Sequence, residues 1–592
     1  MLDDSLGGQD PSEEMNQNGP YTLEWIRRLL TTPLMEGRNL LELTTFAGMS
    51  LWWFVHYRFC NAMLTYAESA RRGKAVASHR SLLSRVSRTS SWLRLFYSSL
   101  LMVICRLNSC LYLSRKNVVR PRILFTAQTV EWRPMADPIS GQTRKTDLYF
   151  DPIIQEMKHA GKYQIQSTYP LGSSASGLRV MIDKRLHERD IVHTPFEAFW
   201  SPSIALVEER TRTRFKKLWA ELQNNSIFNT LLNYREINLL DALRRDIQDY
   251  FEFALPRAAA NLVTAERMIG KKSPNVILLQ NECGAWERAV IAAARLKGVP
   301  TLATQHGIIS VAHPGYYVPD RGFAQRHLLP IPDLTAVFGE YSRSVLTKLL
   351  NYPSDRVIAV GNPQYDYIPS LLSHSPPDLR NNACRELGLD PSRRILLVAT
   401  GALQSKYGYP DYDRLLLEAV FSMKLSRPEL QLILKLHPKE DGLLQRTMAL
   451  ERGLSDFVIV KDERARPLWI SDLVITIHSA FAMEAIAMGK PLMIVNLTGS
   501  PDIYPYVTAG AAIGVYGQED LLHAIDDILD NQQTRDRLAQ GRQQFIQDHL
   551  NSVDGHSAER IIELVERISK PYHAEGEAHS DSRMLTDKDK SA

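Results

Sequence analysis

The sequence is poor in several features that would assign a protein to a class at once. Its 592 residues include only five cysteines, and no two of them are spaced as CxxC. So small and odd a number argues against a disulfide framework and against a zinc site, and it fits a reducing compartment. The first twenty residues are polar and acidic, so no cleavable signal peptide is visible. We therefore expect the protein in the cytoplasm.

Acidic residues are absent from one long stretch. Between Glu68 and Glu131 the chain has no aspartate or glutamate, but it has twelve arginines and lysines. Long apolar runs are absent as well. The segment 95–105 is apolar for only 11 residues, and the aromatic-rich segment 43–64 includes a histidine and an arginine. Because a membrane-spanning helix needs about 20 apolar residues, neither segment is expected to span a membrane.

Short apolar faces beside many arginines are typical of helices that lie in a membrane interface. A polybasic flank adds about 1 kcal/mol of binding per lysine or arginine near an anionic leaflet. We therefore expect residues 21–120 to form a helical region that associates with the inner face of the cell membrane. The alternative is a helical subdomain that packs on the core. A nucleic-acid patch is less favoured, since no nucleic-acid module accompanies the charge.

From residue 122 onward, apolar runs of strand length alternate with helical segments. The first series has predicted strands at 122–129, 163–170, 274–282 and 299–307. The second series has predicted strands at 356–361, 394–400, 431–437, 457–460, 473–476 and 491–496. This alternation predicts parallel, doubly wound sheets, so the fold class is α/β with two Rossmann-like domains. Ligands bind such sheets at the carboxyl ends of the strands, which here would face a cleft between the domains.

The predicted organisation has five parts. They are a disordered segment (1–20), the basic, aromatic-rich helical region (21–120), an N-terminal acceptor domain (121–350), a C-terminal nucleotide-donor domain with two closing helices (351–571) and a disordered polar tail (572–592).

One predicted strand ends in an unusual triplet. The stretch 301-TLATQHG-307 places Gln305, His306 and Gly307 at the carboxyl end of the strand. Glycine lets the backbone turn or approach a ligand closely. His306 could deprotonate an acceptor hydroxyl, because the ordinary pKa of histidine is about 6.5. We place Gln305 and Gly307 in the acceptor site. The alternatives are a structural histidine, and Glu282, at another strand end, as the base.

A second histidine, His437, ends the predicted strand 431–437. Lys435 precedes it by two residues, so both side chains point to one face of the strand. Pro438 fixes the turn and directs the chain out of the sheet. A cationic pair at a strand end suits a phosphate or pyrophosphate, and His437 could stabilise a departing phosphate.

The segment 471–496 predicts a strand, a helix and another strand. His478, Ser479 and Ala480 open the helix, whose free N–H groups and partial positive charge suit a phosphate. Ser479 also fits an N-cap. Glu484, about one turn further on, could accept hydrogen bonds from a ribose. The alternatives are a plain helix cap and a surface carboxylate.

Backbone groups complete the predicted donor site. Gly401 and Ala402 follow the strand 394–400, and their N–H groups would lie near a diphosphate. The alternative is an ordinary loop. We expect no metal ion, and no cofactor other than the nucleotide-activated co-substrate.

Several of these segments resemble known families. Residues 471–496 resemble the nucleotide-binding strand, helix and strand of GT-B glycosyltransferases. The segment 435-KLHP-438 resembles the His-Pro motif of bacterial sialyl- and polysialyltransferases and of CDP-glycerol glycerophosphotransferases. The element 304-TQHG-307 is similar to a Trp-His-Gly element of the glycerophosphotransferases, with glutamine in place of tryptophan. The segment 360-VGNPQYD-366 is similar to an element shared with UDP-GlcNAc 2-epimerase-like proteins, and 553-VDGHSAERI-561 to a closing helix.

The resemblance covers about residues 270–570 and implies a GT-B fold, with two Rossmann-like domains facing a cleft. It implies a transferase that uses a nucleotide-activated donor and a surface-polysaccharide or lipid-linked acceptor. Where the glycerophosphotransferases usually carry an Asp-Tyr-Ser-Ser-like run, this chain has 477-IHSA-480, so we expect transfer of a sugar. The alternatives are a polyol-phosphate transferase, a UDP-sugar 2-epimerase or hydrolase, and a non-catalytic scaffold of a glycan assembly complex.

Overall fold

The structure, a computed structural model, describes most of the chain. The described residues are 19–71, 91–110, 120–137, 141–171, 175–311, 313–323, 328–374, 378–401, 412–437, 440–461, 463–477, 479, 481–499, 502 and 504–569. The disorder predicted for the two ends of the chain falls on residues 1–18 and 572–592, which lie outside this part. Helix α2 (Gly19–Thr31) already begins at Gly19.

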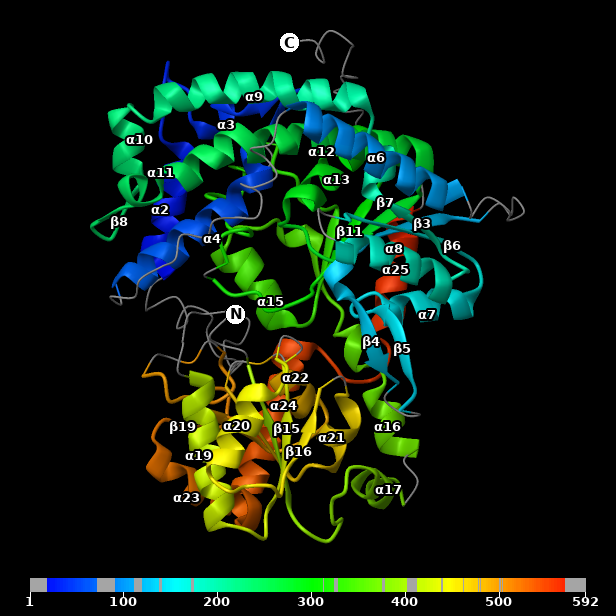
Figure 1. Ribbon diagram of the computed structural model, residues 1–592, viewed down its shortest axis with the longest axis vertical. Helices are drawn as coiled ribbons and strands as arrows, with labels where there is room; N and C mark the ends of the chain where they lie inside the picture. The colour runs from blue at the N-terminus through cyan, green and yellow to red at the C-terminus, as the bar shows by residue number, and fades with distance from the viewer. Residues whose placement is uncertain are drawn as a thin grey trace, which may run out of the picture.

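Seven parallel strands form the N-terminal sheet, in the order β13-β12-β11-β10-β3-β6-β7 (Figure 1). The strands are β3 (Arg122–Thr126), β6 (Gln164–Tyr169), β7 (Val192–Pro195), β10 (Val276–Leu279), β11 (Thr301–Thr304), β12 (Leu334–Val337) and β13 (Val357–Ala359). The central strands β10, β11 and β12 are buried throughout, as expected where helices cover both faces of a parallel sheet.

Helices surround this sheet. They are α2, α3 (Leu40–Leu43), α4 (Trp52–Arg71), α6 (Ser91–Cys110), α7 (Asp151–Ala160), α8 (Ala175–His187), α9 (Pro202–Leu222), α10 (Ser226–Leu231), α11 (Leu239–Asp249), α12 (Leu255–Lys272), α13 (Ala285–Leu296) and α15 (Glu340–Ser344). The short hairpins are β1–β2 (Thr45–Phe46, Met49–Ser50), β4–β5 (Trp132–Ala136, Thr143–Asp147) and β8–β9 (Asn233–Tyr234, Ile237–Asn238).

Six parallel strands form the C-terminal sheet, in the order β16-β15-β14-β17-β18-β19. The strands are β14 (Ile395–Ala399), β15 (Gln431–Lys435), β16 (Val458–Val460), β17 (Leu473–Thr476), β18 (Leu492–Val495) and β19 (Ile513–Val515). The helices are α16 (Ile368–His374), α17 (Leu379–Glu386), α19 (Tyr412–Ser426), α20 (Leu443–Glu451), α21 (Ala465–Ile470), α22 (Phe481–Ala487), α23 (Leu521–Asp530), α24 (Gln532–Leu550) and α25 (Ser557–Ser569).

Alternate residues of the C-terminal strands face two separate cores. In β14, Ile395 and Leu397 join the core that contains α22, whereas Leu396 and Val398 join the core that contains α19 and α23. A strand sends successive side chains to opposite faces, so a run that is apolar at every position predicts burial on both sides. From β14 onward, the predicted burial of the second series of strands on both faces is confirmed.

The strand predicted at 356–361 forms, but it belongs to the N-terminal sheet. Strand β13 pairs with β12 in parallel, with Thr335 opposite Val357. The chain therefore enters the second sheet only at β14, and the expectation that 356–361 opens the second series is wrong. Strands β7, β12 and β19 were not predicted.

The aromatic residues of the N-terminal region mostly face the protein core. Helix α4 buries Trp52, Trp53, Phe54 and Phe59 within the core of the N-terminal domain. This corrects the expected membrane-interface role of α4 and supports the alternative of a packed helical subdomain. Helix α6 differs, since it lies at the periphery beside α9 (Figure 1). In the described part of the chain, no helix is both long and apolar enough to cross a membrane.

The chain passes between the two domains twice, and one carboxylate joins the two passages. Asp366 accepts hydrogen bonds from the backbone N–H groups of Ser557, at 3.1 Å, and Ala558, at 2.8 Å. It therefore caps α25, which packs back on the N-terminal domain. The segments 360–366 and 553–561, each similar to a family element, are thus in contact and close the fold.

Candidate active site

His306 follows β11 at the carboxyl edge of the N-terminal sheet. Its ring is partly exposed and meets the ring of Tyr149 edge-on, with the centroids 6.0 Å apart. Burial lowers the pKa of His306 below its ordinary value, and a hydrogen bond with the Gln280 backbone offsets only part of this effect. The imidazole is therefore neutral at pH 7, so it can accept a proton.

Gln305 holds the turn that presents this histidine. Its side-chain oxygen accepts a hydrogen bond from the backbone N–H of Phe338 at 2.7 Å, and its amide nitrogen donates to the Gly307 carbonyl at 2.8 Å. The side chain thus ties the ends of β11 and β12 together. A Cβ added at Gly307 would meet open space, so packing does not require glycine there. That space is free for a ligand to approach the backbone.

Glu282 lies inside the N-terminal domain. Its carboxylate accepts hydrogen bonds from the hydroxyl groups of Tyr352, at 2.5 Å, and Thr335, at 3.2 Å, and the residue is 2% exposed. Burial raises the pKa of Glu282, although these hydroxyl groups and Arg288 oppose the effect. The carboxylate therefore accepts hydrogen bonds from neighbours within its own domain.

The loop after β15 is held by a carboxylate that the sequence did not single out. The backbone N–H of His437 donates to Glu440 at 2.7 Å and to the Thr400 hydroxyl at 3.2 Å. The Thr400 hydroxyl donates to the same carboxylate. The Lys435 ammonium lies 5.1 Å from the centre of the Phe481 ring. Glu440 thereby fixes His437 at the carboxyl edge of the C-terminal sheet.

Ser479 and Lys435 both contact Phe481, the first residue of α22. The Ser479 hydroxyl accepts a hydrogen bond from the Phe481 N–H at 3.1 Å, which is the predicted capping contact. Gly401 ends the described stretch after β14. The remaining predicted donor-site residues lie outside the described residues; they are Ala402, Pro438, His478 and Ala480.

Glu484 lies on α22 and pairs with an arginine that the sequence analysis missed. Its carboxylate oxygen accepts from Arg464, at 2.9 Å, and from the Tyr367 hydroxyl, at 2.8 Å. Another nitrogen of Arg464 lies 3.5 Å from the side-chain oxygen of Gln364. Glu484 is 2% exposed, so it is not the surface carboxylate of the alternative interpretation.

The charge of Arg464 also affects a residue on the His306 side of the site. Burial raises the pKa of Tyr149 to about 12, and the positive charge of Arg464 is among the effects that oppose this rise. Tyr149 belongs to the N-terminal domain and contacts His306, whereas Arg464 and Glu484 belong to the C-terminal domain. The positive charge of Arg464 therefore acts on a residue that contacts the candidate base. No sequence motif marked Arg464.

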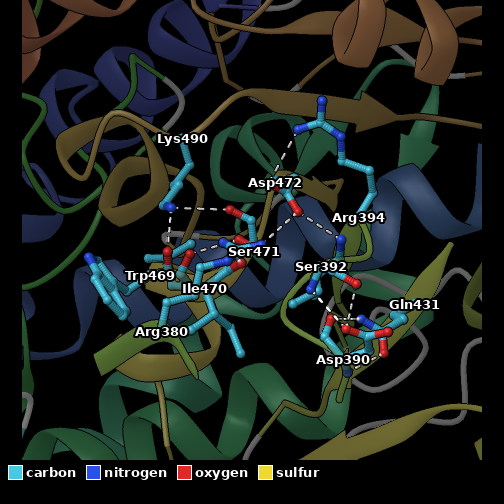
Figure 2. Close-up of polar contacts among 12 residues, drawn as sticks. Arg380, Asp390, Ser392, Arg394, Gln431, Trp469, Ile470, Ser471, Asp472 and Lys490 are labelled. Atoms are coloured by element: carbon cyan, nitrogen blue, oxygen red, sulfur yellow. Dashed lines mark hydrogen bonds and ion pairs between the residues drawn. The ribbon is translucent and has the colours of Figure 1, made fainter. Parts of the chain in front are cut away.

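The residues just before β18, Gly489, Lys490 and Pro491, lie at the other end of its sheet. Figure 2 shows Lys490 among polar contacts at the amino ends of the C-terminal strands. Its ammonium donates to the Ser471 carbonyl at 3.1 Å and to that of Trp469. Nearby, Asp472 accepts from the Ile395 N–H at 2.8 Å. These contacts join loops at the edge of the sheet that is remote from the candidate site. Lys490 therefore has a structural role.

Two parallel sheets, each with helices on both faces and a histidine at its carboxyl edge, define a GT-B-like fold. Residues 285–567, just under half of the chain, match the family described as CDP-Glycerol:Poly(glycerophosphate) glycerophosphotransferase. Over this segment the chain is similar to that family, which confirms the predicted resemblance. The description names glycerol phosphate, not a sugar, as the transferred group. The predicted transferase class is therefore confirmed, but transfer of a sugar is not.

Solved structures are similar at low identity. UDP-GlcNAc 2-epimerase from Neisseria meningitidis is 11% identical, with a TM-score of 0.46, over 75% of this chain and 100% of that one. A glycosyltransferase from Rickettsia africae is 13% identical, with a TM-score of 0.43, over 77% and 100%. The wall teichoic acid polymerase TagF is 10% identical, with a TM-score of 0.42, over 81% and 98%. No curated protein gives a significant match.

Proposed function

We propose that this protein transfers a polyol phosphate, of which glycerol phosphate is the simplest, from a CDP-activated donor to a hydroxyl group at the end of a polymer. Residues 285–567 match a family of glycerophosphotransferases, and one observation supports the proposal beyond this match. The neutral His306 of one domain and the Arg464–Glu484 pair of the other are linked through Tyr149. We infer that the base and the donor site face one cleft between the two domains.

The chemistry follows from these groups. His306 takes the proton of the acceptor hydroxyl, and the hydroxyl oxygen attacks the phosphorus that carries the polyol. The bond from that phosphorus to the bridging oxygen breaks, and CMP leaves. Lys435, His437 and the N–H groups near Ser479 stabilise the charge on the leaving phosphate. The products are the polymer longer by one polyol phosphate, CMP and the proton held by His306.

His306 is a better base than Glu282 in this arrangement. His306 is partly exposed at the strand end, whereas Glu282 is buried and its carboxylate accepts hydrogen bonds from Tyr352 and Thr335. We expect His306→Ala to lower kcat by about two to four orders of magnitude, the usual contribution of a general base. Activity that falls this far in Glu282→Gln but not in His306→Ala would reverse the assignment.

A nucleotide-sugar donor is the second candidate. The helix start 477-IHSA-480 has one hydroxyl where the related enzymes carry two, so its contacts with the donor differ. With a sugar donor, the acceptor oxygen attacks a carbon atom and a nucleoside diphosphate leaves, or CMP leaves if the donor is a CMP-sugar. With CDP-glycerol, attack at phosphorus releases CMP and adds a phosphate to the polymer. Analysis of the product for a phosphodiester therefore separates the two.

The first experiment is thermal unfolding of the purified protein with CMP, CDP, UDP, GDP or dTDP. A ligand at 100 times its dissociation constant adds about 2.7 kcal/mol of stability. We expect a shift with the cytidine nucleotides that His437→Ala abolishes, whereas His523→Ala, on the exposed side of α23, retains it. A shift with UDP alone would favour a UDP-sugar transferase, or an epimerase or hydrolase if no acceptor is needed. No shift at all, with no turnover, would favour a scaffold.

A further inference from the structure

Gln128 lies at the carboxyl edge of the N-terminal sheet, level with His306. It follows the end of β3 by two residues, as His306 follows the end of β11. Strand β10 lies between the two and pairs with both, so that Leu279 is opposite Thr126 on one side and Ala303 on the other. Because neighbouring strands are about 4.8 Å apart, the backbones at Gln128 and His306 are roughly 10 Å apart. One small group can therefore contact both side chains.

The nitrogen of the Gln128 amide is held by a carboxylate. It donates a hydrogen bond to Glu287, which lies in the first turn of α13. A carboxylate only accepts hydrogen bonds, so the amide nitrogen faces it and the amide oxygen faces away. This oxygen makes no hydrogen bond within the described part of the chain, and Gln128 is partly exposed. A hydrogen-bond acceptor is thus left for a ligand at this strand end.

Glu287 itself is nearly closed to solvent. The residue is 2% exposed, and its carboxylate lies over Gly284, where an added Cβ would collide with it. Burial raises the pKa of Glu287 to about 7, and its own backbone N–H and the positive charge of Arg58 oppose the rise. A carboxylate so enclosed does not contact a ligand directly. Glu287 can affect a ligand only through Gln128.

His306 supplies the second half of the site. The backbone carbonyl of Gln280, the first residue after β10, engages one ring nitrogen of His306 in a hydrogen bond. The neutral ring therefore keeps its lone pair on the other nitrogen, which takes the proton of the attacking hydroxyl. One oxygen and one nitrogen at this edge of the sheet thus each need a hydroxyl group as donor.

We propose that Gln128 binds a second hydroxyl group of the acceptor, next to the one that His306 deprotonates, and that Glu287 positions Gln128 for this contact. The inference rests on the proposed transfer to a polymer end. It makes the acceptor a terminal unit with two neighbouring hydroxyl groups, as in glycerol or a sugar ring. A terminal phosphate dianion has no proton to donate, and the charge of Glu287 would repel it.

The dimensions agree with this proposal. Two hydrogen bonds of about 2.8 Å, with roughly 3 Å between neighbouring hydroxyl oxygens, span roughly 8–9 Å. That length is close to the spacing of the two strand ends on either side of β10. A unit with a single hydroxyl group would satisfy His306 and leave the Gln128 oxygen without a donor.

The test compares two soluble acceptors by isothermal titration calorimetry of the full-length protein. One is a short glycerol phosphate oligomer. The other has 1,3-propanediol in place of the terminal glycerol, so it lacks only the neighbouring hydroxyl group. The variants are Gln128→Met and Glu287→Gln. The matched controls are Gln248→Met and Glu252→Gln, which disrupt another hydrogen bond between a glutamine and a glutamate, of 2.7 Å, between α11 and α12.

The ratio of the two affinities is the expected signal. The unmodified protein should bind the glycerol oligomer about fivefold more tightly than the propanediol oligomer, as one hydrogen bond provides. Gln128→Met should bind the two oligomers equally, because methionine offers only a weak acceptor. Glu287→Gln should discriminate only about twofold, since its side chain can also donate and no longer fixes the amide. Both controls should retain the fivefold ratio.

A pH profile of this ratio separates positioning by Glu287 from a purely structural role. Above pH 7 the carboxylate is charged and keeps the Gln128 oxygen facing away, whereas below pH 7 it is protonated and can donate to that oxygen. The ratio should therefore fall from about fivefold at pH 8 to about twofold at pH 6, and it should not change with pH in Glu287→Gln. Protonation of His306 affects both oligomers alike. Burial raises the pKa of nearby Cys283 to about 12, so this thiol does not titrate in the range.

Several results would overturn the proposal. They are equal binding of the two oligomers by the unmodified protein, no binding of either, a ratio that survives in Gln128→Met, or the same loss in the controls. Tighter binding of an oligomer that ends in a hexose, lost in Gln128→Met, would assign the second hydroxyl group to a sugar ring. Failure of the proposed function looks different: the ratio in binding would persist, but incubation with CDP-glycerol would release no CMP.

Discussion

Replacing Arg464 by methionine should destabilise the C-terminal domain, because it leaves the carboxylate of Glu484 buried without its cation. The Glu484 side chain is 3% exposed, and the 2.9 Å ion pair with Arg464 is supplemented only by the Tyr367 hydroxyl among the hydrogen bonds described above. Breaking a fully buried pair costs about 3–5 kcal/mol. The Arg464 side chain is 25% exposed, so solvent screens part of the loss and we expect about 2–3 kcal/mol.

A second substitution separates the pair from its surroundings. Glu484→Gln removes the buried charge. The double variant, Arg464→Met with Glu484→Gln, should therefore lose about 2 kcal/mol less stability than the sum of the two single losses. The control is Arg452→Met, whose partner Glu418 lies 3.7 Å away and is about a third exposed. That change should cost about 1 kcal/mol or less.

Equilibrium urea denaturation of the four proteins measures the coupling, and the transfer reaction is measured in parallel. If Arg464 also contacts the donor, activity stays low in the double variant although stability returns. Recovery of both stability and activity would show that the pair is only structural. A loss below about 1 kcal/mol in Arg464→Met, or a coupling energy near zero, would refute the reasoning from burial.

Three further predictions concern residues away from the transferred group. Asp366→Ala should cost about 1 kcal/mol and make α25 more susceptible to proteolysis, because it removes the cap of that helix; unchanged proteolysis would contradict this. Gln305→Leu should cost about 1–3 kcal/mol in denaturation, because it leaves the Phe338 N–H buried without an acceptor. Burial lowers the pKa of His56 and of His313 to about 3, against about 6.5 when unfolded. Each histidine therefore makes its full contribution to the free energy of unfolding above pH 6.5, and about 2 kcal/mol of it is lost by pH 5. Denaturation above pH 6.5 and at pH 5 tests this. Equal stability of the protein under both conditions would contradict it.

The sequence by itself determined the strands that are continuous apolar runs. The stretch 473–476 was predicted with the bounds that β17 has, and 431–437 contains β15. A parallel strand buried on both faces needs apolar residues at nearly every position, so the local pattern is sufficient. The order of strands and helices then placed His306 and His437 at carboxyl edges, because parallel strands end on the same side of a sheet.

Packing decided which of two similar helices is buried. Helices α4 and α6 each have 20 residues and are rich in aromatic and aliphatic side chains. In α4 these side chains fill the core, whereas α6 leaves a stripe exposed. Composition cannot separate the two, because burial depends on which neighbours the rest of the chain supplies.

Only the tertiary structure decided the contacts between distant segments. Asp366 caps a helix that begins 191 residues later, and Tyr367 reaches Glu484 across 117 residues. Strand β13 joined the first sheet for the same kind of reason, since its pairing with β12 is not encoded in the pattern of either strand. Periodicity reports the environment of a residue along one element. It contains no information on which distant side chain completes a buried ion pair or caps a helix, and that choice is made by the packing of the two domains.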